Sequence, residues 1–179
     1  MVEAPRKFGL RPMLPEDAPL LAEIFRASVE GLTGDDYSPE QQEAWVSAVN
    51  DEAAFADRLG GQLTLVSTSR GEPVAFASLK GTDVIDLVYV DPSAARQGAA
   101  TMLIDALEKL AEARGATRLT TDVSDSAVDF FEGRGYAAQL RNSVLRNDEW
   151  LSNTTMTKQL VTPNNTPPET ELGGSGNVH

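Results

Sequence analysis

The stretch Val84–Leu107 reads VIDLVYVDPSAARQGAATMLIDAL, and its pattern changes twice. Its first seven residues are apolar and rich in β-branched side chains except for Asp86, which predicts a strand over Val84–Val90. Asp91-Pro92 ends this strand, a loop of small residues follows, and apolar positions then recur at helical spacing. We therefore expect a strand, a small-residue loop and a helix from about Gly98 to Ala113.

The flanking segments predict a mixed sheet. Turn residues separate Gln62–Ser69, Val74–Lys80 and Val84–Val90, so these strands are expected to form an antiparallel meander. The helix and the strand Leu119–Val123 that follow form a crossover, which implies some parallel pairing. Further strands are predicted at 8–12, 137–145 and 150–160, and further helices from 15, from 39, at 51–59 and at 126–134. The expected fold class is α/β (α+β), a mixed, mostly antiparallel sheet flanked by helices.

Two regions of different composition are expected. Residues 1–160 carry the helical and strand patterns and are predicted to form one domain. Residues 161–179 are rich in proline, asparagine and glycine and hold no aromatic residue, so they are predicted to form a disordered tail.

Composition excludes several kinds of site and partner. The chain has no cysteine, and its single histidine is His179, so neither a thiolate site nor a Ser-His-Asp relay is expected. No acidic spacing resembles a calcium loop, and no metal is expected. A net charge of −12 argues against nucleic acid, and no apolar run approaches the roughly 18 residues of a membrane span. The expected location is therefore cytoplasmic.

The junction before the long helix has the features of an anion site. The first amides of a helix have no partner within it, and the helix dipole adds positive charge there. Gly98, Ala99 and Ala100 are small enough for a phosphate to approach the backbone, and Arg96 can add a charge contact. The alternative is a tight strand-to-helix turn in which glycine serves packing alone.

At these residues the chain resembles the GCN5-related N-acetyltransferases, the GNAT family. Ala95-Arg96-Gln97-Gly98-Ala99-Ala100 is similar to the family pattern Gln/Arg-x-x-Gly-x-Gly/Ala and departs from it at Ala95. Ser124–Tyr136 is similar to the family's late Asn-x-x-Ala-x-x-φ-Tyr-Glu-x-x-Gly-Phe segment, in which φ is apolar. The resemblance covers roughly residues 8–160 and extends to a bacterial subgroup of uncharacterised members.

The resemblance implies where acetyl-CoA would bind, as a co-substrate held between two splayed strands, Val84–Val90 and Leu119–Val123. Its pantetheine arm would pair with the first strand and its pyrophosphate with backbone amides, while Ser124 would lie near the thioester. The implied contacts are Leu87, Val88, Tyr89, Val90, Arg96, Gln97, Gly98, Ala99, Ala100, Thr101, Ser124 and Phe131.

Asp86 and Tyr89 are the leading candidates for proton transfer, and Asp122 on the facing strand could act as the base in place of Asp86. Asp86 interrupts an apolar strand and is expected to share a face with Val88 and Val90; burial would raise its pKa toward that of a useful base. The alternative is a structural aspartate bonded to a neighbouring strand or helix. Phe131 stands where the family has a proton-donating tyrosine, and Tyr89 is the other candidate for that role.

The implied reaction is transfer of an acetyl group to a primary amine by direct attack. The acceptor is a small-molecule or peptide amine, and Tyr37, Trp45 and Trp150 are candidates for lining its pocket. The oligomeric state is left open between a monomer and a homodimer. The alternative function is a non-catalytic acyl-CoA-binding regulatory protein, which the departures at Ala95 and Phe131 favour.

Overall fold

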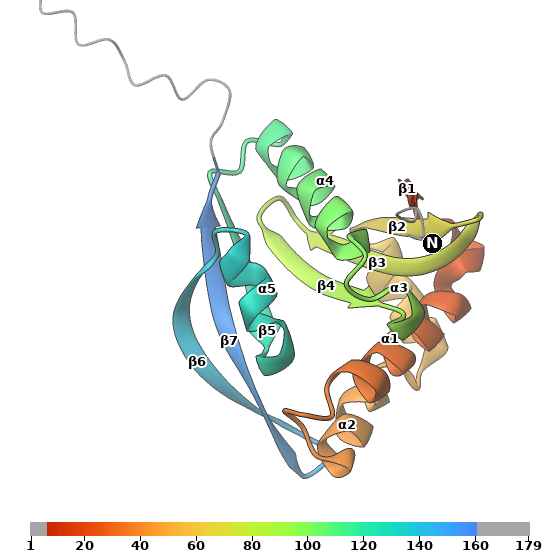
Figure 1. Cartoon of the computed structure of the whole chain (residues 1–179), viewed down its shortest axis with the longest axis vertical. Helices are drawn as coiled ribbons and strands as arrows, with labels where there is room; N and C mark the ends of the chain where they lie inside the picture. Colours follow the sequence, from red (N-terminus) through yellow and green to blue (C-terminus); the bar gives the residue numbers. More distant parts are fainter. Residues whose placement is uncertain (1–6, 161–179) are drawn as a thin grey trace, which may run out of the picture.

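A seven-stranded sheet organises residues 7–160, the part of the chain that the computed structural model describes (Figure 1). The strand order is β1-β2-β3-β4-β5-β7-β6, and every neighbouring pair is antiparallel except β4 and β5. The strands are β1 (Gly9–Pro12), β2 (Leu63–Ser69), β3 (Glu72–Lys80), β4 (Val84–Val90), β5 (Arg118–Ser124), β6 (Ala137–Arg146) and β7 (Glu149–Gln159).

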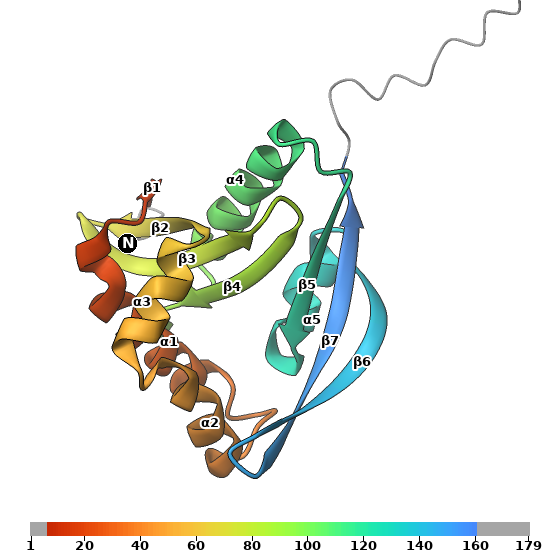
Figure 2. The ribbon, with the colours of Figure 1, turned by 180° about the vertical axis from the view of Figure 1, so that it is seen from behind.

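Helices cover both faces of this sheet, which confirms the predicted fold class. α4 covers one face of β2–β4 in Figure 1, and α1 and α3 cover the opposite face in Figure 2. The helices are α1 (Ala18–Leu32), α2 (Pro39–Val46), α3 (Glu52–Gly60), α4 (Ala99–Ala113) and α5 (Val128–Gly133), with 3-10 turns η1 (Pro15–Asp17), η2 (Ser47–Val49), η3 (Pro92–Ala94) and η4 (Asp125–Ala127).

Two hydrophobic cores lie on the two faces. The α4-side core contains Leu103, Leu107 and Met156, all fully buried. The core under α1 and α3 contains Phe25 and Phe76, which are also almost fully buried. Burying apolar surface on both sides stabilises the sheet between them.

The sequence signal at the start of α2 is confirmed in detail. The Gln41 backbone N–H donates to Ser38 Oγ at 3.1 Å, and the Ser38 N–H donates to Gln41 Oε1 at 2.8 Å. Pro39 follows at the first helical position, where a missing N–H costs nothing. This capping fixes where the helix begins and where Tyr37, just before it, lies.

β4 and β5 pair only at their beginnings. Val84 lies opposite Thr120 and Ile85 opposite Thr121, and no further pair joins the two strands. Figure 2 shows β4 and β5 diverging beyond this point, so that the sheet opens into two halves, β1–β4 and β5–β7. Backbone groups on the facing edges of both strands are left for other partners.

A bulge in β4 corrects the expected position of Asp86. Ser78 of β3 pairs with Leu87 and Leu79 pairs with Ile85, so Asp86 has no opposite residue. An unpaired bulge residue shifts the alternation of side chains along its strand. The Asp86 carboxylate therefore bonds on the α3 side, whereas Val88 and Val90 pack against the α4-side core.

Two expectations concern membrane spans and the C-terminal residues 161–179. No helix within residues 7–160 is long and apolar enough to cross a membrane. The predicted disordered tail at 161–179, with His179, lies outside the described residues. The cytoplasmic location stays a prediction.

Candidate active site

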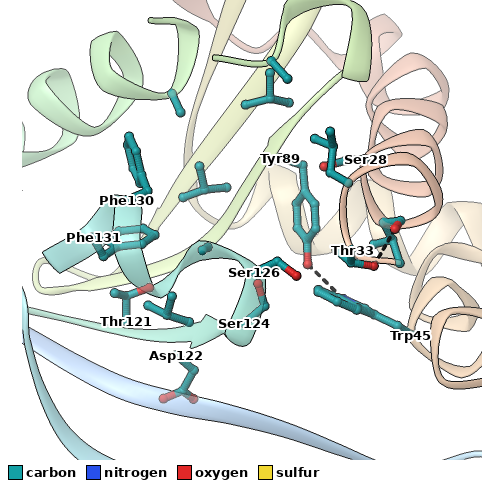
Figure 3. A pocket seen from close by; sticks show the side chains of 18 of the residues that line it. Ser28, Thr33, Trp45, Tyr89, Thr121, Asp122, Ser124, Ser126, Phe130 and Phe131 are labelled. Carbon is teal, nitrogen blue, oxygen red and sulfur yellow. Dashed lines mark hydrogen bonds between the residues drawn. The ribbon is translucent and has the colours of Figure 1, made fainter. Parts of the chain in front are cut away.

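A cavity of about 290 Å³ occupies the gap where β4 leaves β5. Residues from both strands line it, together with residues from α1, α5 and the start of α4 (Figure 3). A pocket of this kind, at the diverging ends of two parallel strands, is a common place for a ligand. We refer to it as the first cavity.

The start of α4 supplies free backbone donors at one end of the first cavity. Gly98 is the N-cap of α4 with φ 94°, a left-handed conformation suited to glycine, and no side chain caps the helix. The amides of Ala99, Ala100 and Thr101 belong to the first turn and have no partner within the helix. Arg96 and Ala100 line the cavity itself.

The Gln97 side chain is engaged within its own loop. Its Nε2 donates to the Ser93 carbonyl oxygen at 3.1 Å, which bridges the loop before α4. This bond uses one of the two side-chain N–H donors of Gln97.

The free edge of β4 presents the backbone of two residues to the gap. The Asp91 N–H donates to the Val74 carbonyl oxygen at 2.8 Å. This bond shows which residues of β4 direct their backbone groups toward β3 and which direct them away from it. Because antiparallel pairs alternate between bonded and non-bonded positions, Val88 and Val90 direct their N–H and C=O groups away from β3. Leu87 and Tyr89 direct theirs toward β3, so only two of the four predicted strand contacts have free backbone groups.

Leu87 and Tyr89 contribute differently through their side chains. Leu87 is buried in the core under α1 and α3 and does not line the first cavity. Tyr89 does line it, and its ring lies against Phe25 with centroids 4.1 Å apart. The Trp45 Nε1–H donates to the Tyr89 hydroxyl oxygen at 3.1 Å (Figure 3). Burial raises the pKa of Tyr89 to about 12.

Among the described residues, the Tyr89 hydroxyl accepts a hydrogen bond but donates none. The oxygen accepts from Trp45, and no acceptor for its own proton lies within hydrogen-bond distance in that part of the chain. Because the pKa is high, the hydroxyl is protonated at neutral pH. A protonated hydroxyl in a cavity wall can donate to a bound group.

Asp86 is held in a structural network, which corrects the expected pKa. Arg58 Nε donates to Asp86 Oδ2 at 2.9 Å and Nη2 to Oδ1 at 3.0 Å, while Gln62 Nε2 donates to Oδ2 at 2.8 Å. Burial opposes ionisation of Asp86, but the hydrogen bonds from Arg58 and Gln62 outweigh it and hold the pKa below the ordinary value. The expected rise in pKa was wrong, and the alternative of an aspartate bonded to a neighbouring helix describes the contacts.

Ser124 and Phe131, two further predicted contacts, both line the first cavity. Ser124 ends β5 beside the gap, and Figure 3 shows its side chain on the same side as that of Ser126. Phe131 is buried and packs edge-on against Tyr136 at 5.1 Å between ring centroids. The Tyr136 hydroxyl donates to Glu108 Oε1 at 3.0 Å, which occupies its proton inside the core.

A second cavity, of about 270 Å³, lies on the other side of the gap. Of the three candidates for the acceptor pocket, Tyr37 and Trp45 line this cavity, whereas Trp150 does not and is 58% exposed. Both cavities share a set of lining residues at their junction: Trp45, Asp86, Tyr89, Asp122 and Ser124. A molecule in one cavity can therefore contact a molecule in the other.

No grouping within residues 7–160 has the histidine, aspartate and glutamate content that a metal ion needs. The described site thus offers backbone amides, hydroxyls, guanidinium groups and carboxylates.

A model of the acetyltransferase (GNAT) domain matches residues 33–160. The chain belongs to the GNAT acetyltransferase family. A GNAT relative from Escherichia coli, the uncharacterized N-acetyltransferase YafP, is 31% identical over 144 residues, which span 80% of this chain and 91% of YafP. The predicted family is therefore confirmed.

Solved structures agree with this GNAT assignment. A crystal structure from Rhodopseudomonas palustris, described as a GCN5-related N-acetyltransferase and a class-II aminotransferase, is 61% identical with a TM-score of 0.85 over 89% of this chain and 99% of that one. The PaiA N-acetyltransferase from Thermoplasma acidophilum, in complex with coenzyme A, is 17% identical with a TM-score of 0.71 over 86% and 99%. The second likeness shows the shared fold.

Several residues of this GNAT site were not found from the sequence. Arg58 and Gln62 bind Asp86 from 28 and 24 positions away along the chain. Trp45 was expected near the acceptor, but its hydrogen bond to Tyr89 was not predicted, because the two residues are 44 positions apart in the sequence. Such pairs are set by the packing of α2 and α3 on the sheet, which residue spacing does not encode.

Proposed function

We propose that this GNAT protein transfers the acetyl group of acetyl-CoA to a primary amine by direct attack. The observation that carries the proposal is the divergence of β4 from β5, because two cavities meet across the gap at shared residues. One cavity has an anion-binding end at α4, and the other does not include that end. Two substrates could thus meet at the junction.

The residues around the first cavity fit acetyl-CoA. The uncapped amides of Ala99 to Thr101 and the charge of Arg96 suit a pyrophosphate, and Gly98 leaves its backbone accessible. The free backbone groups of Val88 and Val90 suit the amide-rich pantetheine arm. Ser124 and Phe131 would border the thioester end.

The same residues account for the proposed chemistry. As the amine nitrogen bonds to the thioester carbon, the carbonyl oxygen gains negative charge that the Val88 amide stabilises. The carbon–sulfur bond breaks, and the Tyr89 hydroxyl donates its proton to the departing sulfur. The attacking nitrogen loses its extra proton to solvent as the amide forms, and the Tyr89 oxygen takes up a proton from solvent. Asp86 has a lowered pKa, so its negative charge attracts the ammonium form of the amine but does not remove the proton, which the amine releases to solvent before it attacks.

A specific observation also favours the non-catalytic alternative. Phe131, which lines the first cavity, cannot donate a proton, and Ala95 lacks the side chain that the family pattern uses near the phosphates. In this alternative the protein binds acetyl-CoA and responds to it without turnover.

One experiment separates the two functions. Purified protein is given acetyl-CoA and a panel of amines, thiol release is followed optically, and products are identified by mass spectrometry. Acetylation of any amine above the rate without protein supports the enzyme. Acetyl-CoA binding by calorimetry with no product from the whole panel supports the alternative, and absence of binding contradicts both.

A further inference from the structure

Acidic and basic side chains are distributed differently around the two cavities. Two acids, Asp86 and Asp122, line both cavities and therefore lie at the junction. Arg96 lines only the first cavity, whereas Arg58 and Arg146 line only the second. Arg58 is bonded to Asp86 at the junction, so Asp122 and Arg146 are the two charged residues of the second cavity that have no partner of opposite charge among the described residues.

Asp122 has bonding capacity left for a ligand. Its Oδ1 accepts from the Thr155 hydroxyl at 2.6 Å, and no cation within residues 7–160 pairs with it. Figure 3 shows its carboxylate pointing away from Phe130 and Phe131, toward the opposite face of β5. An unpaired carboxylate at the junction is suited to an ammonium group.

Arg146 is likewise unpaired in the described part of the chain. It ends β6, opposite Glu149 on β7, yet its side chain forms no ion pair or hydrogen bond with Glu149 or with any other described residue. Arg146 lines the second cavity together with Tyr89 and Asp122, so its charge faces the same space as theirs. A free guanidinium is suited to a carboxylate.

Asp86 and Arg58 pair with each other, but Asp122 and Arg146 line the same cavity and form no ion pair within residues 7–160, which indicates a ligand that carries both charges. We infer that the acceptor is a small amine bearing a carboxylate, as a free amino acid does. Its amino group would lie at Asp122, at the junction of the two cavities, and its carboxylate at Arg146. The inference rests on the proposed acetyl transfer and adds the class of acceptor.

Two other acceptor classes fit less well. A polyamine would place a second cation beside Arg58 and Arg146. A peptide N-terminus carries no carboxylate next to its amine. The cavity of about 270 Å³ lies near the lower end of the range for small-molecule sites, which suits a single amino acid.

The test compares amines in pairs that differ by one carboxylate. Phenylalanine is paired with phenethylamine and lysine with 1,5-diaminopentane, and kcat/KM is corrected for the fraction of unprotonated amine. We expect the amino acid of each pair to be preferred by roughly tenfold or more, the value of a charged hydrogen bond. Equal use of both, or preference for the amine without carboxylate, would overturn the inference.

Substitution of Arg146 tests whether this residue causes the preference for the amino acid in each pair. Arg146→Gln should reduce the preference within each pair to about twofold, whereas Arg118→Gln, an exposed arginine of β5 outside both cavities, should keep it. A preference that survives Arg146→Gln contradicts the assignment of the carboxylate site. If no amine of either kind is acetylated while acetyl-CoA binds, the proposed function itself has failed, and the inference with it.

Discussion

Gly98 is the single residue on which the proposed pyrophosphate site depends most. An added Cβ would meet no atom within 4 Å, so space alone does not require glycine. Gly98→Glu should lower the affinity for acetyl-CoA at least about a hundredfold, because like charges brought together cost several kcal/mol. Calorimetric titration with acetyl-CoA measures this loss.

Gly98→Gln is the matched control for that change. It has the same size and the same cost of about 1–2 kcal/mol for a side chain at φ 94°, but it carries no charge. We expect it to bind acetyl-CoA clearly better than the glutamate variant. Equal losses would show that backbone strain, rather than phosphate binding, explains the result.

The Asp86–Arg58 pair makes a pH-dependent contribution to stability. The pKa of Asp86 is lowered in the folded state, so its ionised form stabilises the protein above the ordinary value of 3.8, and this contribution is lost as pH falls through the folded-state value. Asp86→Asn should lower the free energy of unfolding by about 1 kcal/mol at pH 7, since the pair is partly exposed. The difference should shrink at pH 3; urea unfolding that shows a pH-independent difference would contradict this.

Tyr89 is the proposed proton donor. Tyr89→Phe keeps the ring against Phe25 and should lower kcat about tenfold, less than acid catalysis usually contributes because a thiolate is already a good leaving group. With a pKa of about 12, loss of the Tyr89 proton should not lower kcat between pH 7 and about pH 10. Trp45→Phe is the control, since it removes the same hydrogen bond but leaves the hydroxyl; a kcat equal to that of Tyr89→Phe would assign the effect to positioning.

At the scale of elements, the boundaries were largely predictable and their pairing was not. Proline, capping residues and apolar spacing are local, and they located the start of α2 and both ends of β4. The bulge at Asp86 depends on the register with β3, and β7 lies between β5 and β6 instead of following sequence order. Both are long-range choices, so the period-two rule gave the wrong side for Asp86.

The loop before α2 is joined to β7 and η4 by one side chain. The Tyr37 hydroxyl donates to the Ser152 carbonyl oxygen at 2.6 Å and accepts from the Asp125 N–H at 2.9 Å. Tyr37→Phe should lower the free energy of unfolding by about 1–3 kcal/mol, because a partly buried N–H and C=O lose their partners. Hydrogen exchange at Asp125 should become faster.

Tyr136→Phe provides the comparison for Tyr37→Phe. It removes a hydroxyl that bonds to Glu108 of α4, and not to η4 or β7 as the Tyr37 hydroxyl does. Thermal unfolding should register both variants, but the Asp125 amide should exchange faster only in Tyr37→Phe. Faster exchange in both variants would mean that the loop has no separate role in joining the two halves.

At the scale of the whole molecule, the open sheet and the net charge act together. β1–β4 and β5–β7 diverge, and the cavities form between the two halves rather than on either one. The family pattern predicted this arrangement through the two strands, but the charges around the second cavity come from α3, β4, β5 and β6. Only the assembled fold brings those four segments together.

The net charge of −12 should distinguish amines by their own net charge. A cationic amine such as phenethylamine is attracted over distances near the Debye length, which falls from about 30 Å at 0.01 M salt to about 10 Å at 0.1 M. With acetyl-CoA saturating, kcat/KM for phenethylamine should fall about threefold over that range, whereas the value for zwitterionic phenylalanine should change less than twofold. Parallel slopes for the two acceptors would mean that only local contacts at Asp122 and Arg146, and not the field of the whole protein, govern how amines reach the site.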